Sequence, residues 1–338
     1  MRCLALGEAW QYCGGKVILM GRVENEALQR RIGELGILFV PLAGAFSPTD
    51  EMRRLNDLLF MLRNTGHTPN CHPWLVLDGY HFDTGYQSMV RGRGYKVCII
   101  DDTAHLNFYD ATIVLNQNVN TSALSYRCSD KTCLLIGSQF ALLRRHFWDM
   151  PRKPRSVSGI AYRVLVSFGG MDACRQLTKV VRALRNVSLA RLEVTLVAGF
   201  EDSDINDLRH VAGELANQHE IHIVSDVQNM PDIMARSNIA ITAGGTTTLE
   251  LCFMGVPMIL IAIADNQLGI ISGLQAAGAG IALGWYNKVS EADIATSMNT
   301  LLQETGRCVR MSQAAQQLVD GKGWQRVIHA FVERHQLS

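Results

Sequence analysis

The sequence has no excess of charge of either sign and no long apolar run. Its 338 residues contain 32 lysines and arginines against 31 aspartates and glutamates, so the formal net charge is +1 at pH 7. This balance encodes no broad attraction to nucleic acid or to an acidic membrane surface. No window approaches the roughly 20 uncharged apolar residues of a membrane-spanning helix, and residues 1–6 lack the pattern of a signal peptide. We therefore expect a soluble, cytoplasmic protein that binds no nucleic acid and does not insert into membranes.

The cysteines lack the spacing of a metal site or of a disulfide framework. There are nine, an odd number, with no C-x-x-C and no His/Cys set at zinc spacing. Most lie inside apolar runs, such as Cys98 in YKVCII and Cys252 in LELCFM. This placement indicates buried, reduced thiols, which suit a cytoplasmic protein.

Familiar nucleotide and catalytic motifs are also missing. Neither G-x-G-x-x-G nor G-x-x-x-x-G-K-[ST] occurs, so the sequence supports neither a dinucleotide fingerprint nor an NTPase phosphate loop. The G-x-S-x-G turn of α/β-hydrolases is absent, and no Ser/His/Asp or Cys/His arrangement stands out. The function must therefore be sought in less common patterns.

Acidic and histidine side chains occur near expected strand ends. Asp101 and Asp102 form an acidic pair, but no further oxygen ligand or histidine is spaced to complete a metal site. We therefore expect neither a metal nor a cofactor. His81 and His105 have the chemistry of acid–base groups, although histidines on loops are often merely solvated, and both interpretations stay open.

Short apolar runs alternate with amphipathic segments from end to end. An apolar content of 48% with 19% charged residues is that of an ordinary globular protein, and the length favours two domains. The strands expected in the first half are residues 16–21, 37–42, 74–78, 96–100, 112–115 and 133–136. Those expected in the second half are residues 163–168, 193–199, 220–224, 239–242, 258–262 and 280–282.

This alternation predicts an α/β protein with two doubly wound, Rossmann-like parallel sheets that face a cleft. Residues 151–156 are Pro-rich and basic, and form the expected linker between an N-terminal domain (1–150) and a C-terminal domain (157–338) that ends in helices from Ser290 onward. The chain departs from this pattern at its start, where residues 1–13 predict a helix and not the usual first strand. Ligand is expected at the carboxyl ends of the strands and in the cleft.

The most informative stretch is residues 241–267, ITAGGTTTLELCFMGVPMILIAIADNQ. It predicts a strand, a tight turn at Gly244 and Gly245, and a helix that begins near Thr246 and Thr247 and stops at Gly255. Unpaired N–H groups and the helix dipole at such a start both attract phosphate. Glu250, one turn further on, could reach a ribose diol. A purely structural turn of an α/β protein fits this pattern about equally well.

A second glycine turn, Gly169 and Gly170, follows the strand that opens the second domain and precedes a helix. Both glycine turns are expected at the same sheet edge, which favours a ligand that contains a diphosphate. No lysine stands beside either turn, which argues against phosphoryl transfer from ATP.

Three further segments with candidate site residues follow predicted strands. Met230 would border a nucleotide base, or it lies in a capped turn before a helix. Asn266 and Gln267 could hydrogen-bond a sugar, while Asp265 or Asn266 could instead cap the next helix, and both roles can coexist. Tyr80 ends a strand of the first domain and is expected to face the cleft.

A set of segments spread over nearly the whole chain carries a family resemblance. In order they are MRCLAL, LVLDGY, IIDD, LNQN, GSQFALLRRHF, VSFGGMD, QNMPDIMARSNIAITAGGTTTLE, GVPMILI and DNQ. With these segments the chain resembles the UDP-sugar hydrolases of pseudaminic acid biosynthesis (PseG) and their spore-coat polysaccharide relatives (SpsG). That family has the GT-B architecture of MurG-type glycosyltransferases.

The resemblance implies metal-independent hydrolysis of a UDP-linked 2,4-diacetamido-2,4,6-trideoxy sugar, in which water attacks the anomeric carbon and UDP leaves. It implies that Tyr80 and Asn266 contact the sugar and the attacking water. Glu250 would hold the ribose, and Gly169 and Gly170 would line the cleft. The full set of substrate-binding residues expected is Gly169, Gly170, Met230, Gly244, Gly245, Thr246, Thr247, Glu250, Asn266 and Gln267.

The start of the chain departs from the family pattern. In the family, the first strand is followed by Gly-x-Gly-His, whose histidine is the proposed general base, and then by a segment like Met1-Arg2-Cys3. The expectation is therefore that this histidine lies upstream of Met1, that the first strand is missing with it, and that the 338-residue chain is nearly inactive and poorly stable. Two alternatives stay open: a glycosyltransferase that uses the same UDP-sugar, and a non-catalytic nucleotide-sugar-binding protein. The oligomeric state is open, with a monomer as the expectation.

Overall fold

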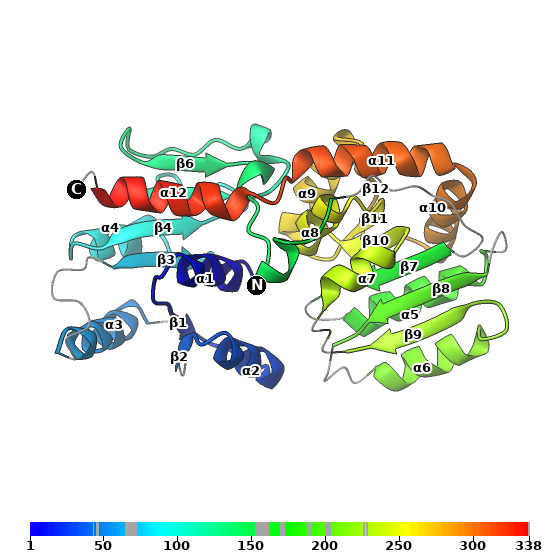
Figure 1. Cartoon of the computed structure of the whole chain (residues 1–338), viewed down its shortest axis with the longest axis horizontal. Coiled ribbons are helices and arrows are strands. Elements are labelled where there is room, and N and C mark those ends of the chain that lie inside the picture. The colour runs from blue at the N-terminus through cyan, green and yellow to red at the C-terminus, as the bar shows by residue number, and fades with distance from the viewer. Residues whose placement is uncertain are drawn as a thin grey trace. The chain divides into compact units, whose positions relative to one another are not determined.

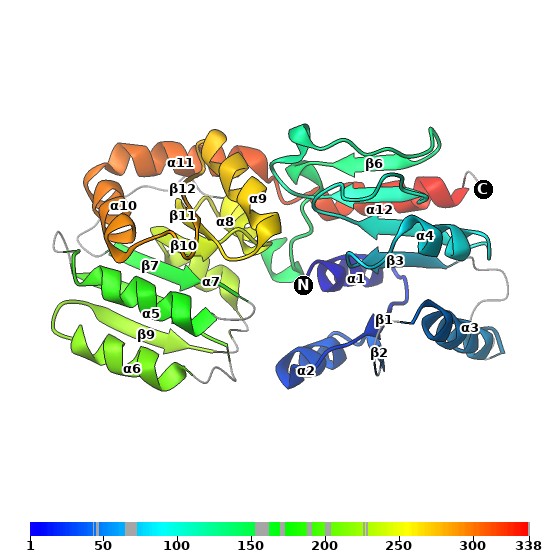
Figure 2. The same ribbon diagram turned by 180° about the vertical axis from the view of Figure 1, so that it is seen from behind.

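A computed structural model describes residues 1–42, 44, 47–64, 73–152, 162–169, 173–187, 191–199, 204–225, 227 and 229–336. The chain forms two compact units (Figures 1 and 2). Unit 1 comprises Met1–Asn116, Leu124–Ile136 and Gln325–Ser338, and unit 2 comprises Gln117–Ala123 and Gly137–Trp324. Of the expected linker 151–156, residues 153–156 lie outside the described residues.

Unit 2 is built on a six-stranded parallel sheet with the order β12-β11-β10-β7-β8-β9. Its strands are β7 (Tyr162–Ser167), β8 (Leu192–Val197), β9 (Glu220–Val224), β10 (Ile239–Ala243), β11 (Met258–Ala262) and β12 (Gly280–Trp285). All residues of β10 and β11 are buried, as their continuous apolar sequence predicts for central parallel strands.

Helices cover both faces of this sheet, and a hydrophobic cluster fills each side. The helices are α5 (Ala173–Leu184), α6 (Ile205–Glu214), α7 (Met230–Arg236), α8 (Thr247–Met254), α9 (Asp265–Ala276), α10 (Glu291–Gln303) and α11 (Thr305–Leu318). Residues of α5, α6 and α10 pack in one cluster, and residues of α7, α8 and α9 in the other. The predicted change to helices after Ser290 is confirmed, and Ser290 opens α10 with a capping box to Asp293.

Unit 1 holds two parallel sheets. One joins β1 (Ile18–Gly21) to β2 (Leu38–Pro41), and the other has the order β3-β4-β5-β6. The strands of the second sheet are β3 (Trp74–Asp78), β4 (Lys96–Ile100), β5 (Ile113–Asn116) and β6 (Cys133–Ile136). The helices are α1 (Arg2–Tyr12), α2 (Glu26–Glu34), α3 (Pro48–Asn64), α4 (Thr84–Arg91) and α12 (Gly323–Gln336). Three short 3₁₀ turns, all of them in unit 2, complete the described elements: η1 (Thr121–Ala123), η2 (Ser138–Phe140) and η3 (Arg145–Phe147).

The strands predicted for the first half are present but do not form one sheet. β1 pairs with β2 and β3 pairs with β4, and within the described residues no strand joins β1 to β3. The predicted opening helix is confirmed as α1. The C-terminal helix α12 returns to unit 1 (Figure 1). Phe331 of this helix packs against Trp10 and Trp74, with ring centroids 5.9 and 4.3 Å away.

The expectation of buried thiols holds at the two positions that the sequence singled out. Cys98 and Cys252 are free and buried, and burial raises the pKa of the Cys252 thiol to about 12. Such thiols stay protonated and unreactive at neutral pH. In the described part of the chain, no helix is long and apolar enough to cross a membrane.

Candidate functional site

The two glycine turns of unit 2 follow neighbouring strands. Gly169 lies two residues beyond β7, and Gly244 directly follows β10. β7 and β10 are paired, with Ser167 opposite Thr242, and the strand order reverses between them. In open parallel sheets, ligands bind beyond the carboxyl ends of the strands at such a switch point. The tertiary structure therefore brings both turns to the position where a ligand is expected; Gly170 lies outside the described residues.

Gly244 is required by close packing. A Cβ atom added to it would lie 2.7 Å from Cγ2 of Ile271 and 3.0 Å from both Cβ and the carbonyl oxygen of Gln267. The turn after β10 thus packs directly on the first turns of α9. Gly245 is different, because a Cβ atom there would meet nothing within 4 Å. Its backbone is open to whatever occupies the space above the turn.

The start of α8 presents backbone donors beside Gly245. Thr246 is its N-cap and makes no side-chain capping bond, while the Thr248 hydroxyl donates to the Gly245 carbonyl oxygen at 2.7 Å. The amides of Thr246 and Thr247 precede the bonds of the first turn, where helix N–H groups lack intrahelical partners. Gly255 ends the helix in the left-handed conformation, with φ of 65°, as predicted. This turn can hold an anion through backbone donors and the helix dipole.

Glu250 is held by an arginine that the sequence reading missed. Nε and the terminal Nη2 of Arg144 donate to Oε1 and Oε2 of Glu250 at 2.6 and 2.7 Å. The Glu250 side chain is 10% exposed, and the Arg144 guanidinium also lies over the Phe147 ring at 5.4 Å. Arg144 belongs to the resemblance segment GSQFALLRRHF, but it lies 106 positions from Glu250, so no local pattern could reveal the pair.

The residues predicted to contact the sugar open helix α9. Asp265, Asn266 and Gln267 are its first three residues, and the N-cap is Ala264 without a side-chain bond. The alternative that Asp265 or Asn266 caps the helix is therefore wrong, because the helix begins one residue earlier than a side-chain cap would require. The Gln267 Oε1 atom accepts a hydrogen bond from the Ile263 amide at 3.0 Å, which fixes the turn between β11 and α9.

Met230 is the first residue of α7, and its side chain is 8% exposed within a hydrophobic cluster of unit 2. The alternative of a capped turn is not formed, because the side chain of the N-cap residue Asn229 makes no capping hydrogen bond. The Asn229 side chain donates instead to Asp232. Met230 thus stabilises the core beside the β9–α7 turn, and its predicted contact with a base stays a prediction.

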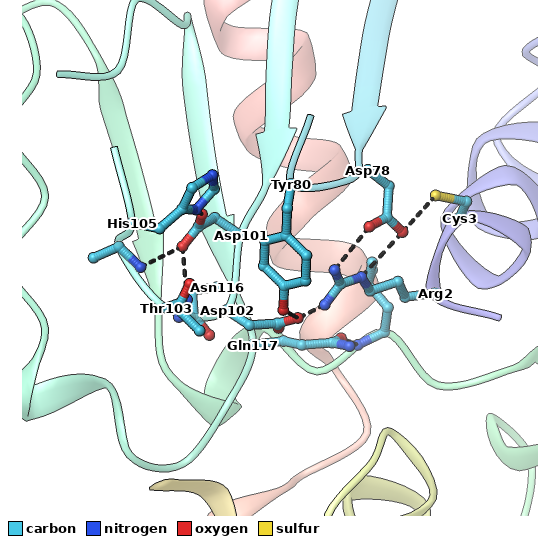
Figure 3. A network of polar contacts seen from close by, with 12 residues as sticks. Arg2, Cys3, Asp78, Tyr80, Asp101, Asp102, Thr103, His105, Asn116 and Gln117 are labelled. Atoms are coloured by element: carbon cyan, nitrogen blue, oxygen red, sulfur yellow. Dashed lines mark hydrogen bonds and ion pairs between the residues drawn. The ribbon is translucent and has the colours of Figure 1, made fainter. Parts of the chain in front are cut away.

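Unit 1 places a charged network at the carboxyl ends of β3 and β4 (Figure 3). The Arg2 guanidinium, at the start of α1, donates to both oxygens of Asp78 at 3.0 and 2.7 Å and to Asp102 at 2.6 Å. The Cys3 thiol donates to Asp78 at 3.1 Å, and the Tyr80 hydroxyl donates to Asp102 at 3.3 Å. Arg2 therefore ties α1 to two strand ends and compensates two carboxylates.

The charges of this network are set by burial and by pairing. Burial raises the pKa of Asp78, but the hydrogen bonds and charge of Arg2 outweigh burial, so the net pKa lies below its ordinary 3.8. Burial, then the Asp78 charge, raises the pKa of the Cys3 thiol far above its ordinary value. At neutral pH the network therefore contains an ionised Asp78 and a protonated Cys3.

Asp101 organises a second network beside the first (Figure 3). Its Oδ1 accepts the amides of Thr103 and Ala104 at 2.8 and 2.6 Å and the Tyr126 hydroxyl at 3.0 Å. Its Oδ2 accepts the Tyr109 hydroxyl at 3.0 Å and lies 2.8 Å from Nδ1 of His105. The carboxylate is thus fully hydrogen-bonded in the interior, as a buried charge requires.

Neither network is arranged as a metal site. Asp78 and Asp102 face the Arg2 guanidinium, and the oxygens of Asp101 are used by hydroxyl, amide and imidazole groups. Across the described ranges, no group of three or more His, Cys, Asp or Glu side chains is placed to hold a metal ion.

Comparison with protein families finds a match within unit 2. Residues 164–323 match the glycosyltransferase family 28 C-terminal domain. The chain is 21% identical over 235 residues to the spore coat polysaccharide biosynthesis protein SpsG of Bacillus subtilis, a match that covers 64% of this chain and 68% of SpsG. It is 22% identical over 218 residues to an uncharacterized protein of Methanocaldococcus jannaschii, covering 63% of this chain and 43% of that protein. The chain thus spans less than half of the archaeal relative.

Solved structures show the fold. MurG of Acinetobacter baumannii superposes with a TM-score of 0.68 and 14% identity, over 97% of this chain and 94% of MurG. The spinosyn rhamnosyltransferase SpnG, complexed with thymidine diphosphate, gives a TM-score of 0.60 with 15% identity, over 95% of this chain and 92% of SpnG. The predicted GT-B fold class is therefore confirmed: the chain is a two-unit α/β protein of the GT-B type with a C-terminal domain like that of family 28 glycosyltransferases.

Proposed function

We propose that this protein is an enzyme acting on a UDP-sugar, whose diphosphate binds at the turn between β10 and α8. The observation that carries the proposal is the pair of glycine turns at the strand-order reversal of unit 2, one of which opens α8 with free backbone donors. The family 28 match covers both turns, and the similar SpnG was solved with a nucleoside diphosphate.

Each predicted residue has a role in this proposal. Gly244, Gly245, Thr246 and Thr247 hold the diphosphate, because their backbone donors and hydroxyls surround the helix start. Glu250 binds the ribose hydroxyls. A carboxylate has about four lone-pair sites, so the two bonds from Arg144 leave room for a ribose diol. Arg144 thereby positions Glu250.

The remaining substrate contacts are proposed on the resemblance. Gly169 and Gly170 contact the substrate, and Met230 borders the base. Asn266 and Gln267, in the first turn of α9, contact the sugar. The resemblance assigns Tyr80 and Asn266 to contacts with the sugar and the attacking nucleophile.

The proposed reaction is hydrolysis of a UDP-linked 2,4-diacetamido-2,4,6-trideoxy sugar. Water attacks the anomeric carbon, the bond to the diphosphate oxygen breaks, and UDP leaves with the electron pair. UDP is already an activated leaving group, so the enzyme must position the water, accept its proton and stabilise the phosphate charge with preorganised donors. Similarity to SpsG, a polysaccharide biosynthesis protein, supports a role in carbohydrate biosynthesis, and hydrolysis is proposed on the resemblance.

Transfer to a sugar acceptor is the second candidate, favoured by the family 28 domain and by the likeness to the rhamnosyltransferase. Product analysis on a panel of UDP-sugars separates the two. Hydrolysis gives free sugar and UDP without an acceptor, whereas transfer releases UDP only when an acceptor is added. UDP binding without turnover of any UDP-sugar would instead indicate a nucleotide-sugar-binding protein.

Calorimetry with UDP and UMP tests the phosphate site itself. Gly245→Val fills the open space above the turn, so UDP affinity should fall at least about a hundredfold, roughly 2.7 kcal/mol. Gly213→Val in α6 is the matched control, since a Cβ atom there also meets nothing within 4 Å. UMP should be less affected than UDP. Equal UDP affinity of the two valine variants, or no UDP binding by the unchanged protein, would rule the site out.

A further inference from the structure

Two glycines on one face of α9 are covered by a single residue, Asn120. Gly269 and Gly273 are four positions apart, so they lie one above the other on the helix. A Cβ atom added to Gly269 would overlap Nδ2 of Asn120 and lie 3.3 Å from its Cγ. One added to Gly273 would lie 3.1 Å from Cβ of Asn120 and 3.2 Å from its Cα and backbone N. Asn120 therefore packs directly on the backbone of α9.

The segment that carries Asn120 is held at further points of unit 2. Residues 117–123 belong to unit 2, as α9 does. Gln117 is 1% exposed, and its Oε1 accepts the Leu142 amide at 2.8 Å. Val119 packs against the hydrophobic cluster to which residues of α9 contribute. The position of Asn120 is thus set by its own segment as well as by the helix that it covers.

The opposite face of α9 packs on the proposed phosphate turn. The added Cβ atom at Gly244 would meet Gln267 and Ile271, which lie two positions before the two glycines of α9. Residues two positions apart point to nearly opposite sides of an α-helix, because each residue turns the helix by roughly 100°. α9 is therefore held between the β10–α8 turn on one face and Asn120 on the other.

The face that Asn120 covers also carries Asn266, a predicted contact of the sugar. Asn266 precedes Gly269 by three positions and Gly273 by seven, which is the spacing of residues along one helix face. Asn266 is partly exposed. A rotation of α9 about its axis would redirect this side chain, whereas the proposed diphosphate donors lie on another helix, α8. Close packing against Asn120 leaves no room for such a rotation.

Asn120 acts here through its shape. Its Oδ1 atom is buried and has no hydrogen-bond partner among the described residues. A buried acceptor without a partner is unfavourable, so hydrogen bonding of this atom does not explain the position of the side chain. The fit of Asn120 against the two glycines does explain it.

We infer that Asn120 is a positioning residue, which fixes the rotation of α9 and thereby orients Asn266 toward the sugar of the bound UDP-sugar. The inference rests on the proposed function and adds a residue outside the predicted set that determines affinity for the sugar part. All the residues that it uses lie in unit 2. Loss of the fit should weaken binding of the sugar and leave binding of the diphosphate nearly unchanged.

Calorimetry of the full chain with the UDP-linked diacetamido sugar and with UDP tests this role. Gly273→Ala sets a methyl group against Asn120, so affinity for the UDP-sugar should fall about five- to tenfold, the effect of one misplaced hydrogen bond. Affinity for UDP should stay within about twofold. Gly213→Ala in α6 is the matched control, because a Cβ atom there meets nothing within 4 Å. It should bind both ligands as the unchanged protein does.

Paired substitutions separate this contact from a general loss of packing. Asn120→Ala removes the amide that meets Gly269 but keeps the Cβ, Cα and N atoms that meet Gly273. Gly269→Ala should therefore cause no further loss of sugar affinity in the Asn120→Ala protein, where the new methyl group lies 4.0 Å from the remaining Cβ. Gly273→Ala should lower the affinity in both backgrounds, so that its effect adds to that of Asn120→Ala.

Hydrogen exchange gives a readout that does not depend on a ligand. The amides of α9 should exchange faster in Asn120→Ala than in the unchanged protein, with β10 and β11 unaffected. Equal exchange of α9 in the two proteins overturns the inference. So does a Gly273→Ala protein that keeps its full preference for the UDP-sugar over UDP, or that loses both affinities equally.

The unchanged protein distinguishes failure of the inference from failure of the proposed function. If it binds UDP and the UDP-sugar with equal affinity, α9 orients no sugar contact and the inference is wrong. Absence of UDP binding overturns the proposed function, and the exchange rates of α9 then decide separately whether Asn120 positions this helix.

Discussion

The polar groups at the carboxyl ends of the strands differ in kind between the two units. In unit 2 the turn after β10 is made of backbone: two glycines, a helix start and hydroxyls that have no charge of their own. In unit 1 the ends of β3 and β4 are made of charged side chains that satisfy one another through Arg2 and Asp101. The turn of unit 2 contains no charge pair of its own, whereas the side-chain network of unit 1 contributes to the stability of its unit.

The largest expected effect breaks the network of unit 1. Arg2→Met leaves Asp78 and Asp102 without their cation, and removal of one partner from a buried ion pair costs about 3 kcal/mol. Hydrogen exchange should show faster opening of β3 and β4, with the strands of unit 2 unchanged. Arg53→Met is the control, because its pair with Asp50 is largely exposed and contributes little. Equal hydrogen-exchange rates of β3 and β4 in the two variants would show that Arg2 does not stabilise these strands.

A smaller effect is expected from the backbone turn of unit 2. Gly244→Ala places a methyl group 2.7 Å from Ile271, and overpacking of this kind costs about 1–3 kcal/mol. Gly245→Ala should stay within about 0.5 kcal/mol of the unchanged protein, since its methyl group meets no atom within 4 Å. Thermal and urea unfolding of the two alanine variants measures the difference in their free energies of unfolding. If both glycines tolerate alanine equally, packing of the turn on α9 does not explain Gly244.

The smallest effect concerns the pH dependence of unit 1. The pKa of Asp78 is lower in the folded protein than its ordinary 3.8, so the folded state binds this proton less tightly than the unfolded chain does. The stabilisation by Asp78 is therefore complete above that ordinary value and is lost as the pH falls through the lower, folded value.

Urea unfolding of the unchanged protein and of Asp78→Asn between about pH 7 and pH 3 checks this sign. The difference in unfolding free energy between them should be largest at neutral pH and should shrink toward the acidic end. Asp50→Asn is the control, and it should change the unfolding free energy little, because Asp50 and its partner Arg53 are largely exposed. A difference that grows on acidification would contradict the pairing of Asp78 with Arg2.

The fold was largely predictable because its signals are local. Short apolar runs marked the strands, Gly255 marked the end of α8, and Ser290 marked the change to helices. The division of the unit 1 strands between two sheets was not predictable, since no local pattern states which strands pair. Of the two roles left open for the start of α9, the side-chain cap by Asp265 or Asn266 is not formed, because the helix already begins at Asp265.

The residues of the candidate site also divide into those with a local sequence signal and those without one. Gly244, Gly245 and the helix start after them are contiguous, so the sequence alone could mark them as a candidate phosphate site. The partners Arg144 and Glu250 are 106 positions apart, and Arg2 and Asp102 are 100 apart. Charge pairs of that separation carry no sequence signal. His105 lies between the two cases, because its partner is only four residues away but its orientation depends on the whole turn.

By itself, the sequence determined the class of fold, the glycine turns and the absence of a strong charge or membrane signal, because each follows from residues near one another in the chain. Only the tertiary structure decided that the two turns flank the strand-order reversal of one sheet, that Arg144 holds Glu250, and that Asn120 packs on α9. These depend on strand pairing and on long-range desolvated contacts, which exist only once the chain has folded.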